Sequence, residues 1–371
     1  MYILGINFSH HTSLALMKDN KVLLHVLEER LVKRKHFRGL PKLALRLIKQ
    51  YTDVVDVVVG VSGNQAKLDR CVEVLKRDGV HVKSSHLKNL SHHLFHGAAA
   101  FYMSKLDNAS VLVVDGAGSM VPVNKNNRAS ETTSVYDVVF PNIWKPVYKK
   151  FTAGIYDQLI PGLNAHQINI DGLSGWPPNY TASDIERFRK MYSNVDTLEI
   201  DSRIDIGFKY AILTAMIGFR SAGEGKTMGL SAYHNSLEGG TLEDTPYSKL
   251  SAIQIAYKIQ KECEASFLEK IKWCRNKNNL VFGGGCSLNI LGNSVIKKAL
   301  PDVNMYVDPV AMDGTLALGG AAYTFYTLTQ CKDKMEYSIY SGPEYNITKD
   351  EVYSYVDSFN QGTTFKPAIE I

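Results

Sequence analysis

One pair of neighbouring segments constrains the fold of this chain more than any other feature. The segment NLSHHLFHGAAAF has the small, alanine-rich character of a helix, and it is followed by the strand-like run ASVLVVDGAGS. A short and almost wholly apolar run such as VLVVD is typical of a parallel strand that is covered on both faces. Open α/β sheets place their chemistry at the carboxyl ends of such strands, where Asp115 falls. The pair therefore predicts an α/β fold with functional residues at one sheet edge.

The same pair of segments suggests a metal site. His92 and His96 lie four residues apart. In a helix both imidazoles would leave one face about one turn apart, as two ligands of a single metal must. Asp115 is then a candidate third ligand. The alternative is that both histidines are solvated or capping residues near the start of the helix, and the motif alone leaves both interpretations open.

A second aspartate is a candidate companion to these three residues. The run DPVAMDGTLALGG places Asp313 just before a helix of small residues. An aspartate in this position is commonly an N-cap, because its carboxylate accepts the first free amide protons of the helix. With the two histidines and Asp115 it would instead form a mixed nitrogen and oxygen site. Such a site suits Fe, Mn or Zn and leaves positions open for a phosphate or another substrate oxygen.

Length and composition bound the class of protein. A chain of 371 residues predicts about two domains or lobes. Its 42 basic and 37 acidic residues give a net charge of +5, which permits nucleic acid as a partner without demanding it. No apolar run has transmembrane length and the N-terminus lacks the pattern of a signal peptide, so we expect a cytoplasmic protein away from membranes. The five cysteines include no CxxC pair, which favours reduced core thiols.

The order of expected elements indicates a duplicated architecture. The first thirty residues read as a strand meander, and strands then alternate with helix-like runs. The proline-rich and turn-dense region from about Asn124 to Tyr210 is interpreted as an insertion specific to one lobe. Both halves contain a strand that ends in a glycine-rich turn, as a duplicated α/β fold would. We therefore place the first lobe at 1–123, and the insertion with the second lobe at 124–346.

Three glycine-bearing turns are candidates for holding a nucleotide. They read GINFSHHTS, VVDGAGS and FGGGCSLN, and each follows an expected strand. Glycines let backbone N–H groups approach phosphate oxygens, and a helix that starts after the turn adds a favourable dipole. The Walker A and dinucleotide fingerprints are both absent. Each turn alone is equally typical of an ordinary strand-to-helix connection, but three in this order favour nucleotide binding.

Two further motifs carry chemically useful side chains. GEGKTMGLSAY puts Lys226 in a flexible loop, where its ammonium could meet a phosphate or a carboxylate or could simply be solvated. His10 and His11 lie in the first glycine-bearing turn. They are candidates for a catalytic base, because an unperturbed imidazole titrates close to neutrality. The alternative is a pair of polar turn residues.

As a set, these motifs resemble the NodU/CmcH/TobZ-type O-carbamoyltransferases, which are related to the enzymes that transfer threonylcarbamoyl to tRNA adenosine. The matching stretches run from the first strand to about Asn346 and include ILGINFSHHTSLALM, LEERLVKRKHFRGLP, SHHLFHGAAAF, VLVVDGAGS, ETTSVY, GEGKTMGLSAY, NLVFGGGCSLNILGN, DPVAMDGTLALGGAA and SGPEYN. The resemblance implies a duplicated ribonuclease-H-like fold of the actin/Hsp70/sugar-kinase type. In that fold two lobes enclose a cleft for nucleotide and metal.

The resemblance also implies an activity. Relatives transfer a carbamoyl group from carbamoyl adenylate, which is made from carbamoyl phosphate and ATP, to an acceptor hydroxyl with metal assistance and release of AMP. The expected acceptor is a sugar-like small molecule or natural product. The basic tract RLVKRKHFRGLPK keeps a hydroxymethylated base in DNA as an alternative. A nucleotide-binding subunit that assembles with a separate partner is a further alternative, whereas the histidine pair disfavours a Mg²⁺-dependent kinase.

The family's functional residues carry over position by position. Its metal ligands, for which iron is the expected metal, fall on His92, His96, Asp115 and Asp313. The segments that resemble its nucleotide-binding residues contain Lys226, Gly283, Gly284, Gly285, Ser287, Asn289 and Asn293. His10 matches the histidine of the family's first turn, close to the acceptor. Relatives usually have an aspartate after that histidine, whereas this chain has His11, so we expect a different acceptor specificity.

A second departure concerns the end of the matching region. Full-length relatives continue into a YrdC-like domain, which makes carbamoyl adenylate, and this sequence contains no motif of that domain. We expect residues 347–371 to be the start of a linker toward such a domain, present either in a longer protein or as a separate partner. Without it, the chain is expected to complete the transfer but not to start efficiently from carbamoyl phosphate.

Overall fold

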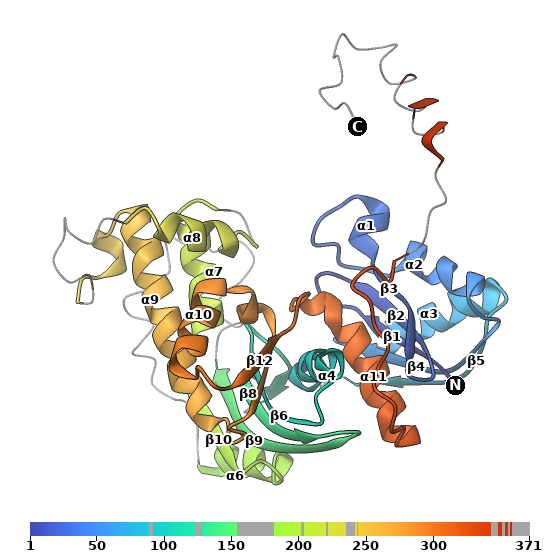
Figure 1. Ribbon diagram of the computed structural model, residues 1–371, viewed down its shortest axis with the longest axis horizontal. Coiled ribbons are helices and arrows are strands. Elements are labelled where there is room, and N and C mark those ends of the chain that lie inside the picture. Colours follow the sequence, from blue (N-terminus) through green and yellow to red (C-terminus); the bar gives the residue numbers. More distant parts are fainter. Residues whose placement is uncertain are drawn as a thin grey trace.

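Two β-sheets with flanking helices form two lobes in the computed structural model (Figure 1). The structure describes residues 1–88, 92–122, 128–153, 182–201, 204–219, 222–234, 242, 244–342, 348–350, 353, 354 and 357. Part of the segment interpreted as an insertion, residues 154–181, lies outside the described residues. The same holds for part of the SGPEYN motif and for most of the expected linker at 347–371.

The first sheet is a five-stranded mixed sheet. Its strands are β1 (Tyr2–Asn7), β2 (Ser13–Lys18), β3 (Lys21–Leu27), β4 (Val54–Val61) and β5 (His81–Leu87). They lie in the order β3-β2-β1-β4-β5, with β1, β2 and β3 antiparallel and with β4 and β5 parallel to β1. The helices of this lobe are α1 (Glu28–Val32), α2 (Lys42–Leu47) and α3 (Gln65–Arg77), with the 3-10 helix η1 (Ile48–Gln50).

The second sheet repeats this arrangement. Its strands are β6 (Asn108–Val114), β7 (Met120–Pro122), β8 (Arg128–Val139), β9 (Ile143–Ala153), β10 (Thr197–Asp201), β11 (Asn279–Gly283) and β12 (Asn304–Val307). Their order is β10-β9-β8-β6-β11-β12, with β6 antiparallel to β8 and parallel to β11. The strands β9-β8-β6-β11-β12 thus have the order and directions of the first sheet. This repeat confirms the duplicated ribonuclease-H-like α/β fold.

The remaining helices mostly cover the second sheet. They are α4 (His92–Ser104), α6 (Ala182–Met191), α7 (Ile206–Met216), α8 (Glu224–Ser231), α9 (Ala252–Lys270), α10 (Ile290–Ala299) and α11 (Leu316–Thr329), with the 3-10 helices η4 (Tyr247–Lys249), η5 (Ile271–Trp273), η6 (Gly285–Leu288) and η7 (Asp313–Thr315). Alternate residues of β6 serve two cores: Val111 and Val113 face α4, while Leu112 and Val114 face α7 and α9. A strand with both faces covered is the reason for the continuous apolar run.

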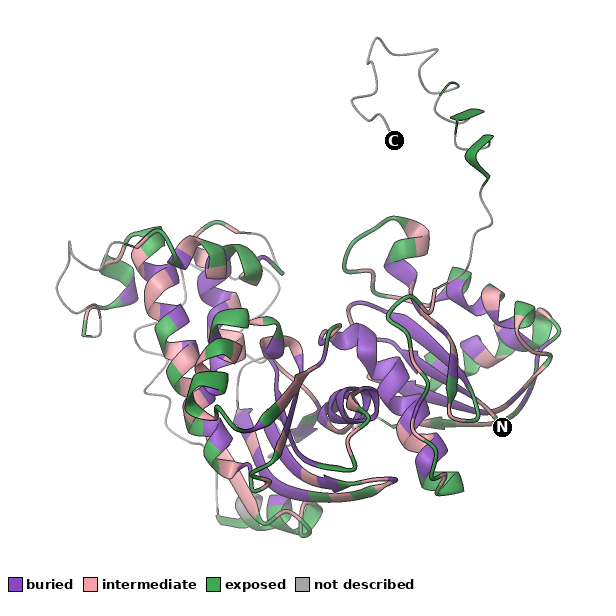
Figure 2. Cartoon of the chain, in the orientation of Figure 1, coloured by how far each residue is buried: buried purple, intermediate pink, exposed green. Residues whose placement is uncertain are grey.

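A buried pair of helices joins the lobes. α4 packs on β6 and β11 of the second sheet, α11 packs on β1, β2 and β4 of the first, and the two helices pack on each other. α4 is almost wholly buried at the centre of the molecule, and α11 is largely buried except for its last turn (Figure 2). Their small residues allow this close approach: a Cβ added to Gly319 would lie 1.8 Å from the carbonyl oxygen of Phe95 on α4. The position of α4 therefore depends on a glycine far away in the sequence.

Replacing Gly319 with alanine should destabilise the protein by ~1–3 kcal/mol, the usual cost of forcing extra volume into a packed core. Urea unfolding followed by circular dichroism measures the change. Gly225→Ala on the exposed side of α8 is the matched control, because a Cβ there meets nothing within 4 Å. That control should be stabilising by ~0.5–1 kcal/mol. Equal unfolding free energies for the two variants would contradict the packing argument.

The structure differs from the sequence-based expectations in three places. The sheets divide between β5 and β6, before the lobe boundary placed at residue 123, because the strand VLVVD is the centre of the second sheet. The region interpreted as an insertion includes β8, β9 and β10, which are integral strands. The loop expected around Lys226 is helix α8. The assignment of residue ranges to domains stays a prediction.

Two expectations about composition can be compared with the structure. All five cysteines are free, and Cys71, Cys263 and Cys274 are buried, as expected for reduced core thiols. Among the described residues, we find no helix with the length and apolar character needed to traverse a bilayer.

Candidate metal centre

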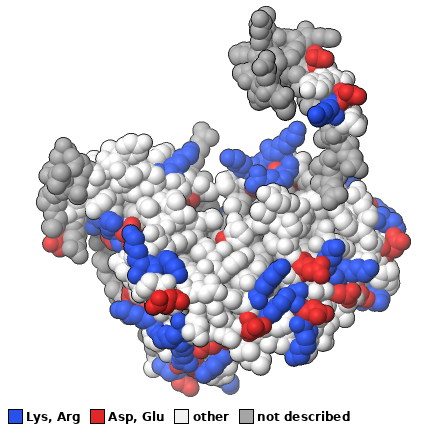
Figure 3. All heavy atoms as spheres, viewed as in Figure 1, with Lys and Arg blue, Asp and Glu red and all other residues white. Residues whose placement is uncertain are grey.

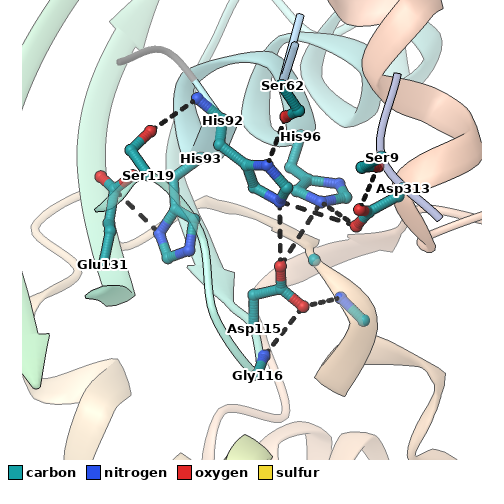
Figure 4. A network of polar contacts seen from close by, with 12 residues as sticks. Ser9, Ser62, His92, His93, His96, Asp115, Gly116, Ser119, Glu131 and Asp313 are labelled. Carbon is teal, nitrogen blue, oxygen red and sulfur yellow. Dashed lines mark hydrogen bonds and ion pairs between the residues drawn. The ribbon is translucent and has the colours of Figure 1, made fainter. Parts of the chain in front are cut away.

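Four side chains from distant parts of the chain meet between the two sheets (Figure 4). His92 and His96 come from the first turns of α4, Asp115 follows β6, and Asp313 lies in η7 just before α11. One ligand atom from each of the four residues can be chosen so that all lie within 4.8 Å of one another. The two histidines are buried and face carboxylates, so the solvated interpretation is wrong.

The distances within the cluster have a consistent pattern. His92 Nε2 lies 3.1 Å from Asp115 Oδ2 and 3.6 Å from Asp313 Oδ1. His96 Nε2 lies 3.7 Å and 3.5 Å from the same two oxygens. Both imidazoles thus direct Nε2 at one pair of carboxylate oxygens. Asp313 faces this cluster and makes no N-cap hydrogen bond, so it is not an N-cap, and its role as a metal ligand stays a prediction.

In both histidines, the ring nitrogen that faces away from the cluster, Nδ1, contacts a neighbouring hydroxyl group. His92 Nδ1 contacts Ser62 Oγ at 3.1 Å, and His96 Nδ1 contacts Thr315 Oγ1 at 3.4 Å. Fixing one ring nitrogen in this way orients the other toward the centre, as in metal sites generally.

The two carboxylates are anchored in the same manner. Asp115 Oδ1 accepts the backbone N–H groups of Gly116 at 2.9 Å and Gly285 at 3.3 Å. Asp313 Oδ2 accepts the Ser9 hydroxyl and lies 3.3 Å from His10 Nδ1. Each carboxylate therefore keeps its other oxygen free to face the centre.

The residues fit a cation at this point. His96 Nε2 is buried and has no hydrogen-bond partner in the described part of the chain, although two carboxylate oxygens face it just beyond hydrogen-bonding distance. A buried polar atom without a partner is costly, and a metal ion would satisfy it. Two imidazoles and two carboxylates form a donor set typical of Fe, Mn or Zn.

The electrostatics of the cluster also favour positive charge. Burial alone would lower the pKa of His92, but the facing carboxylates of Asp313 and Asp115 raise it to about 9. Burial alone would raise the pKa of both carboxyls, but the histidines hold them below the usual range, Asp115 well below it. Two buried carboxylates in contact with imidazoles provide a site that a divalent cation can neutralise.

The predicted nucleotide-binding turn touches this cluster. Gly283 ends β11, and Gly284 has a φ of +84°, with room for no Cβ because Val114 O would lie 2.5 Å from it. The N–H of Gly285 then reaches Asp115. The glycines are therefore required by the close approach of β11 to β6.

The three polar residues expected beside this turn make internal hydrogen bonds. Ser287 Oγ donates to Gly284 O, Asn289 caps α10 by accepting from Gly292 N, and Asn293 Nδ2 donates to Ser287 O. These bonds shape the turn. Lys226 is exposed on α8. Nucleotide binding by these residues remains a prediction.

The two histidines of the first turn have different surroundings. The side chain of His10 is 44% exposed, with Nδ1 facing Asp313 at the edge of the four-residue cluster. His11 is buried and faces away from that cluster, toward His36, with His11 Nε2 and His36 Nδ1 2.7 Å apart. Burial, together with His10, lowers the pKa of His11 to about 4. The structure therefore brings His10, and not His11, to the candidate centre.

Sequence reasoning did not find the groups that hold the ligands. Ser9, Ser62 and Thr315 lie in turns after β1, after β4 and before α11. Each is a common residue at the end of a regular element, where it gives no distinctive signal. The sequence identified the carboxyl ends of β1 and β4. It did not show that these two strands lie beside the candidate ligands.

The chain is similar to several known proteins. A match to the family described as "Carbamoyltransferase N-terminus" covers residues 47–262. The uncharacterized protein sll1178 of Synechocystis sp. is 24% identical over 96% of this chain and 62% of its own length. The nodulation protein NolNO of Sinorhizobium fredii is 27% identical over 30% of this chain and 20% of its own length. The chain thus spans less than two thirds of the length of either curated relative.

Solved structures give remote matches to the whole chain. One is component A of (R)-2-hydroxyglutaryl-CoA dehydratase from Acidaminococcus fermentans, with 12% identity, a TM-score of 0.41, and coverage of 88% of this chain and 98% of that one. Another is the activator of 2-hydroxyisocaproyl-CoA dehydratase from Clostridium difficile with bound ADPNP, with 9% identity, a TM-score of 0.42, and coverage of 90% and 99%. The fold assignment rests on the strand order of the two sheets.

Proposed function

Because this chain belongs to the carbamoyltransferase family, we propose that it transfers a carbamoyl group from carbamoyl adenylate to an acceptor hydroxyl, with release of AMP. The observation that carries the proposal is the convergence of His92, His96, Asp115 and Asp313 beside His10. A transferase of this kind needs a positive centre for the reacting oxygens and a base for the hydroxyl, and the cluster can supply both.

The four side chains would hold a divalent transition metal, for which iron is our first candidate and manganese or zinc are alternatives. When bound, such an ion polarises a carbonyl or phosphoryl oxygen. The contribution of the chain is to fix the four ligand atoms through Ser62, Thr315, Ser9 and the backbone of Gly285. Because these contacts are already made, little rearrangement is needed when substrate arrives.

His10 is the proposed base. Its Nδ1 lies 3.3 Å from Asp313 Oδ2, so the carboxylate can orient the ring and stabilise the imidazolium that forms when it takes a proton. Its partial exposure lets an acceptor hydroxyl approach Nε2. The surface is hollowed between the two lobes, which would admit an acceptor (Figure 3).

The nucleotide would lie along the second lobe. We propose that the turn Gly283–Gly285 and Lys226 on α8 bind the phosphate and the adenosine of carbamoyl adenylate. The backbone N–H groups of a glycine turn and an exposed ammonium both suit a phosphate. Gly285 also contacts Asp115, so a phosphate on this turn would lie next to the candidate metal ligands.

The acceptor of first choice is a sugar-like small molecule or natural product. A hydroxymethylated base in DNA is the second candidate, because exposed basic residues gather at and beyond α1 on the rim of the first lobe (Figure 3): Lys33, Arg34, Lys35 and Arg38. A polyanion would be attracted to such a surface. Carbamoyl adenylate itself would come from a YrdC-like domain or partner, since we assign no adenylate-forming residues to this chain.

Synthetic carbamoyl adenylate tests the proposal directly. The pure chain, loaded with iron, should convert one member of a panel of sugars and hydroxymethylated DNA into a product that carries a carbamoyl group in place of a hydrogen. Mass spectrometry identifies the product, and AMP release gives the rate. With carbamoyl phosphate and ATP instead, we expect little product. No carbamoylated acceptor across a broad panel, with bound metal verified, would refute the transfer.

A further inference from the structure

We propose that His11, Glu29 and His36 bind a second divalent transition metal, most suitably Zn²⁺, next to the four-ligand centre. His11 lies in the turn after β1, Glu29 in α1 and His36 in the segment that follows α1. One ligand atom from each can be chosen so that all three lie within 4.8 Å of one another. Two imidazoles and one carboxylate are a donor set of zinc sites that keep a fourth position open. None of the three belongs to the four-ligand centre.

The ligand atoms face a common point. His11 Nε2 and His36 Nδ1 are 2.7 Å apart, and their rings meet edge to face with centroids 4.8 Å apart. Glu29 Oε2 accepts the backbone N–H of His36 at 2.7 Å, which holds this carboxylate against the same turn. Its Oε1 lies 3.8 Å from Arg30 Nε, too far for a strong hydrogen bond. One oxygen of Glu29 is thus anchored, and the other is available.

Glu29 and its neighbour Glu28 have different roles. Glu28 accepts the backbone N–H groups of Leu43 and Ala44 at 2.9 Å each, and so satisfies the start of α2. Glu29 points instead toward the two histidines, and burial leaves it 9% exposed. A carboxylate that is nearly buried beside imidazoles needs a positive partner. A cation bound by all three side chains would supply it.

Hydrogen bonds between the two turns pre-organise the cluster. The N–H of Thr12 donates to Phe37 O at 3.1 Å, and the N–H of Gly39 donates to Thr12 Oγ1 at 3.2 Å. The residues adjoining both histidines are therefore fixed to each other. His11 and His36 also have left-handed φ angles of 58° and 56°, an unfavourable conformation that only a well-determined turn maintains. Ligands held in advance lose little entropy on binding a metal.

One histidine of this cluster is buried and the other is exposed, as a metal site with an open position requires. His11 is 6% exposed, and its Nε2 faces His36. His36 is exposed. A metal here would therefore be bound on its inner side by the buried His11. A water or a substrate oxygen could reach it from the solvent side.

The cluster adjoins the proposed reaction centre through His10. The His10 ring lies edge to face with that of His11 at 4.9 Å between centroids, and its Nδ1 faces Asp313. The inference does not depend on carbamoyl transfer, since it rests on His11, Glu29 and His36 alone. A hydrogen bond from the N–H of one imidazole to the bare ring nitrogen of the other is the competing explanation for the 2.7 Å contact, and metal binding distinguishes the two.

Zinc titration of the chelator-treated full chain tests the inference. Calorimetry should show two tight equivalents, of which His36→Ala removes one and His96→Ala the other. His36→Ala should lower the affinity for the zinc ion at this site by more than ~10–100-fold, which is the usual loss when a residue that only holds a ligand in place is removed. His81→Ala, which removes another exposed histidine, is the matched control and should keep both equivalents. Zinc-edge anomalous scattering from crystals should place one ion between His11, Glu29 and His36.

The outcomes separate this inference from the proposed function. A single equivalent that His36→Ala removes and His96→Ala does not would support the second site and would count against zinc at the four-ligand centre. Zinc binding that is unchanged in His36→Ala and Glu29→Gln would overturn the inference. Equal losses in His36→Ala and His81→Ala would also overturn it, because they would indicate adsorption to surface histidines.

Discussion

Asp313→Asn is expected to empty the four-ligand centre and to slow carbamoyl transfer by ~10²–10³-fold. The substitution nearly preserves shape but replaces a carboxylate that faces His92 and His96 by a neutral amide. A metal in such a site supplies several kcal/mol of charge stabilisation in the transition state, and each ~1.4 kcal/mol is a factor of ten in rate. Metal content by mass spectrometry and single-turnover rates with carbamoyl adenylate measure the two effects.

A matched control lies five residues earlier. Asp308 is equally buried, but it is not among the four converging side chains, and burial raises the pKa of its carboxyl. Asp308→Asn should therefore keep the metal. If Asp313→Asn retained both the metal and the rate of the unmodified protein, the four-ligand assignment would be wrong. A loss of metal with an unchanged rate would refute only the catalytic role.

Lys270→Met is expected to lower the free energy of unfolding by ~3–5 kcal/mol, the cost of leaving a buried charge without its partner. Lys270 on α9 donates to Asp205 Oδ1 at 2.9 Å, and both side chains are almost fully buried. Asp205 also caps α7 through Ile206 N and accepts from Thr133 Oγ1 on β8. The pair thus ties two helices to the second sheet, and urea unfolding at pH 7 measures its loss.

Lys261→Met on the same helix is the control for that change. Lys261 is 54% exposed and pairs with Glu264 at the surface. Surface ion pairs contribute only ~0–1 kcal/mol, so this variant should unfold almost as the unmodified protein does. Equal losses of unfolding free energy in the two variants would show that the buried ion pair contributes no more to stability than the exposed one.

The effect of Lys270→Met should also depend on pH. Burial would raise the pKa of Asp205, but Lys270 and Lys150 hold it well below the ordinary value of 3.8. A carboxyl with a depressed folded-state pKa adds stability that is fully present above its ordinary pKa and is lost as the pH falls below it. The difference in unfolding free energy between the unmodified protein and Lys270→Met should therefore narrow as the pH falls through 3.8. A difference that does not change with pH would contradict the electrostatic origin of the effect.

Local patterns in the sequence were sufficient for many elements. The apolar run in β6 and the small-residue helices α4 and α11 were predicted because burial on both faces, or close packing, restricts which residues are allowed. The i, i+4 spacing of His92 and His96 placed both imidazoles on one helix face, since helix geometry is independent of what the helix contacts. The run before α11 offered Asp313 as a candidate companion, and the position-by-position resemblance then carried the family's metal ligands onto all four residues.

Long-range features were not predictable in this way. The integral strands β8 and β9 were interpreted as part of an insertion because the region is proline-rich and turn-dense, and nothing in the sequence shows that Lys149 and Glu131 meet. In the structure these two side chains form a buried ion pair. The pairing of His11 with His36 was missed for a similar reason, since nothing in either turn shows that backbone hydrogen bonds bring them together.

The sequence by itself determined several of the helices and strands, among them β6, α4 and α11, and the residue types that stand at their ends, because both depend on contacts within a few residues. Only the tertiary structure decided that His92, His96, Asp115 and Asp313 share one point. That convergence requires β6 to take the centre of the second sheet and α11 to cross back onto the first. Strand order and helix crossing are fixed by packing between segments hundreds of residues apart, and this packing leaves no periodic trace in the sequence.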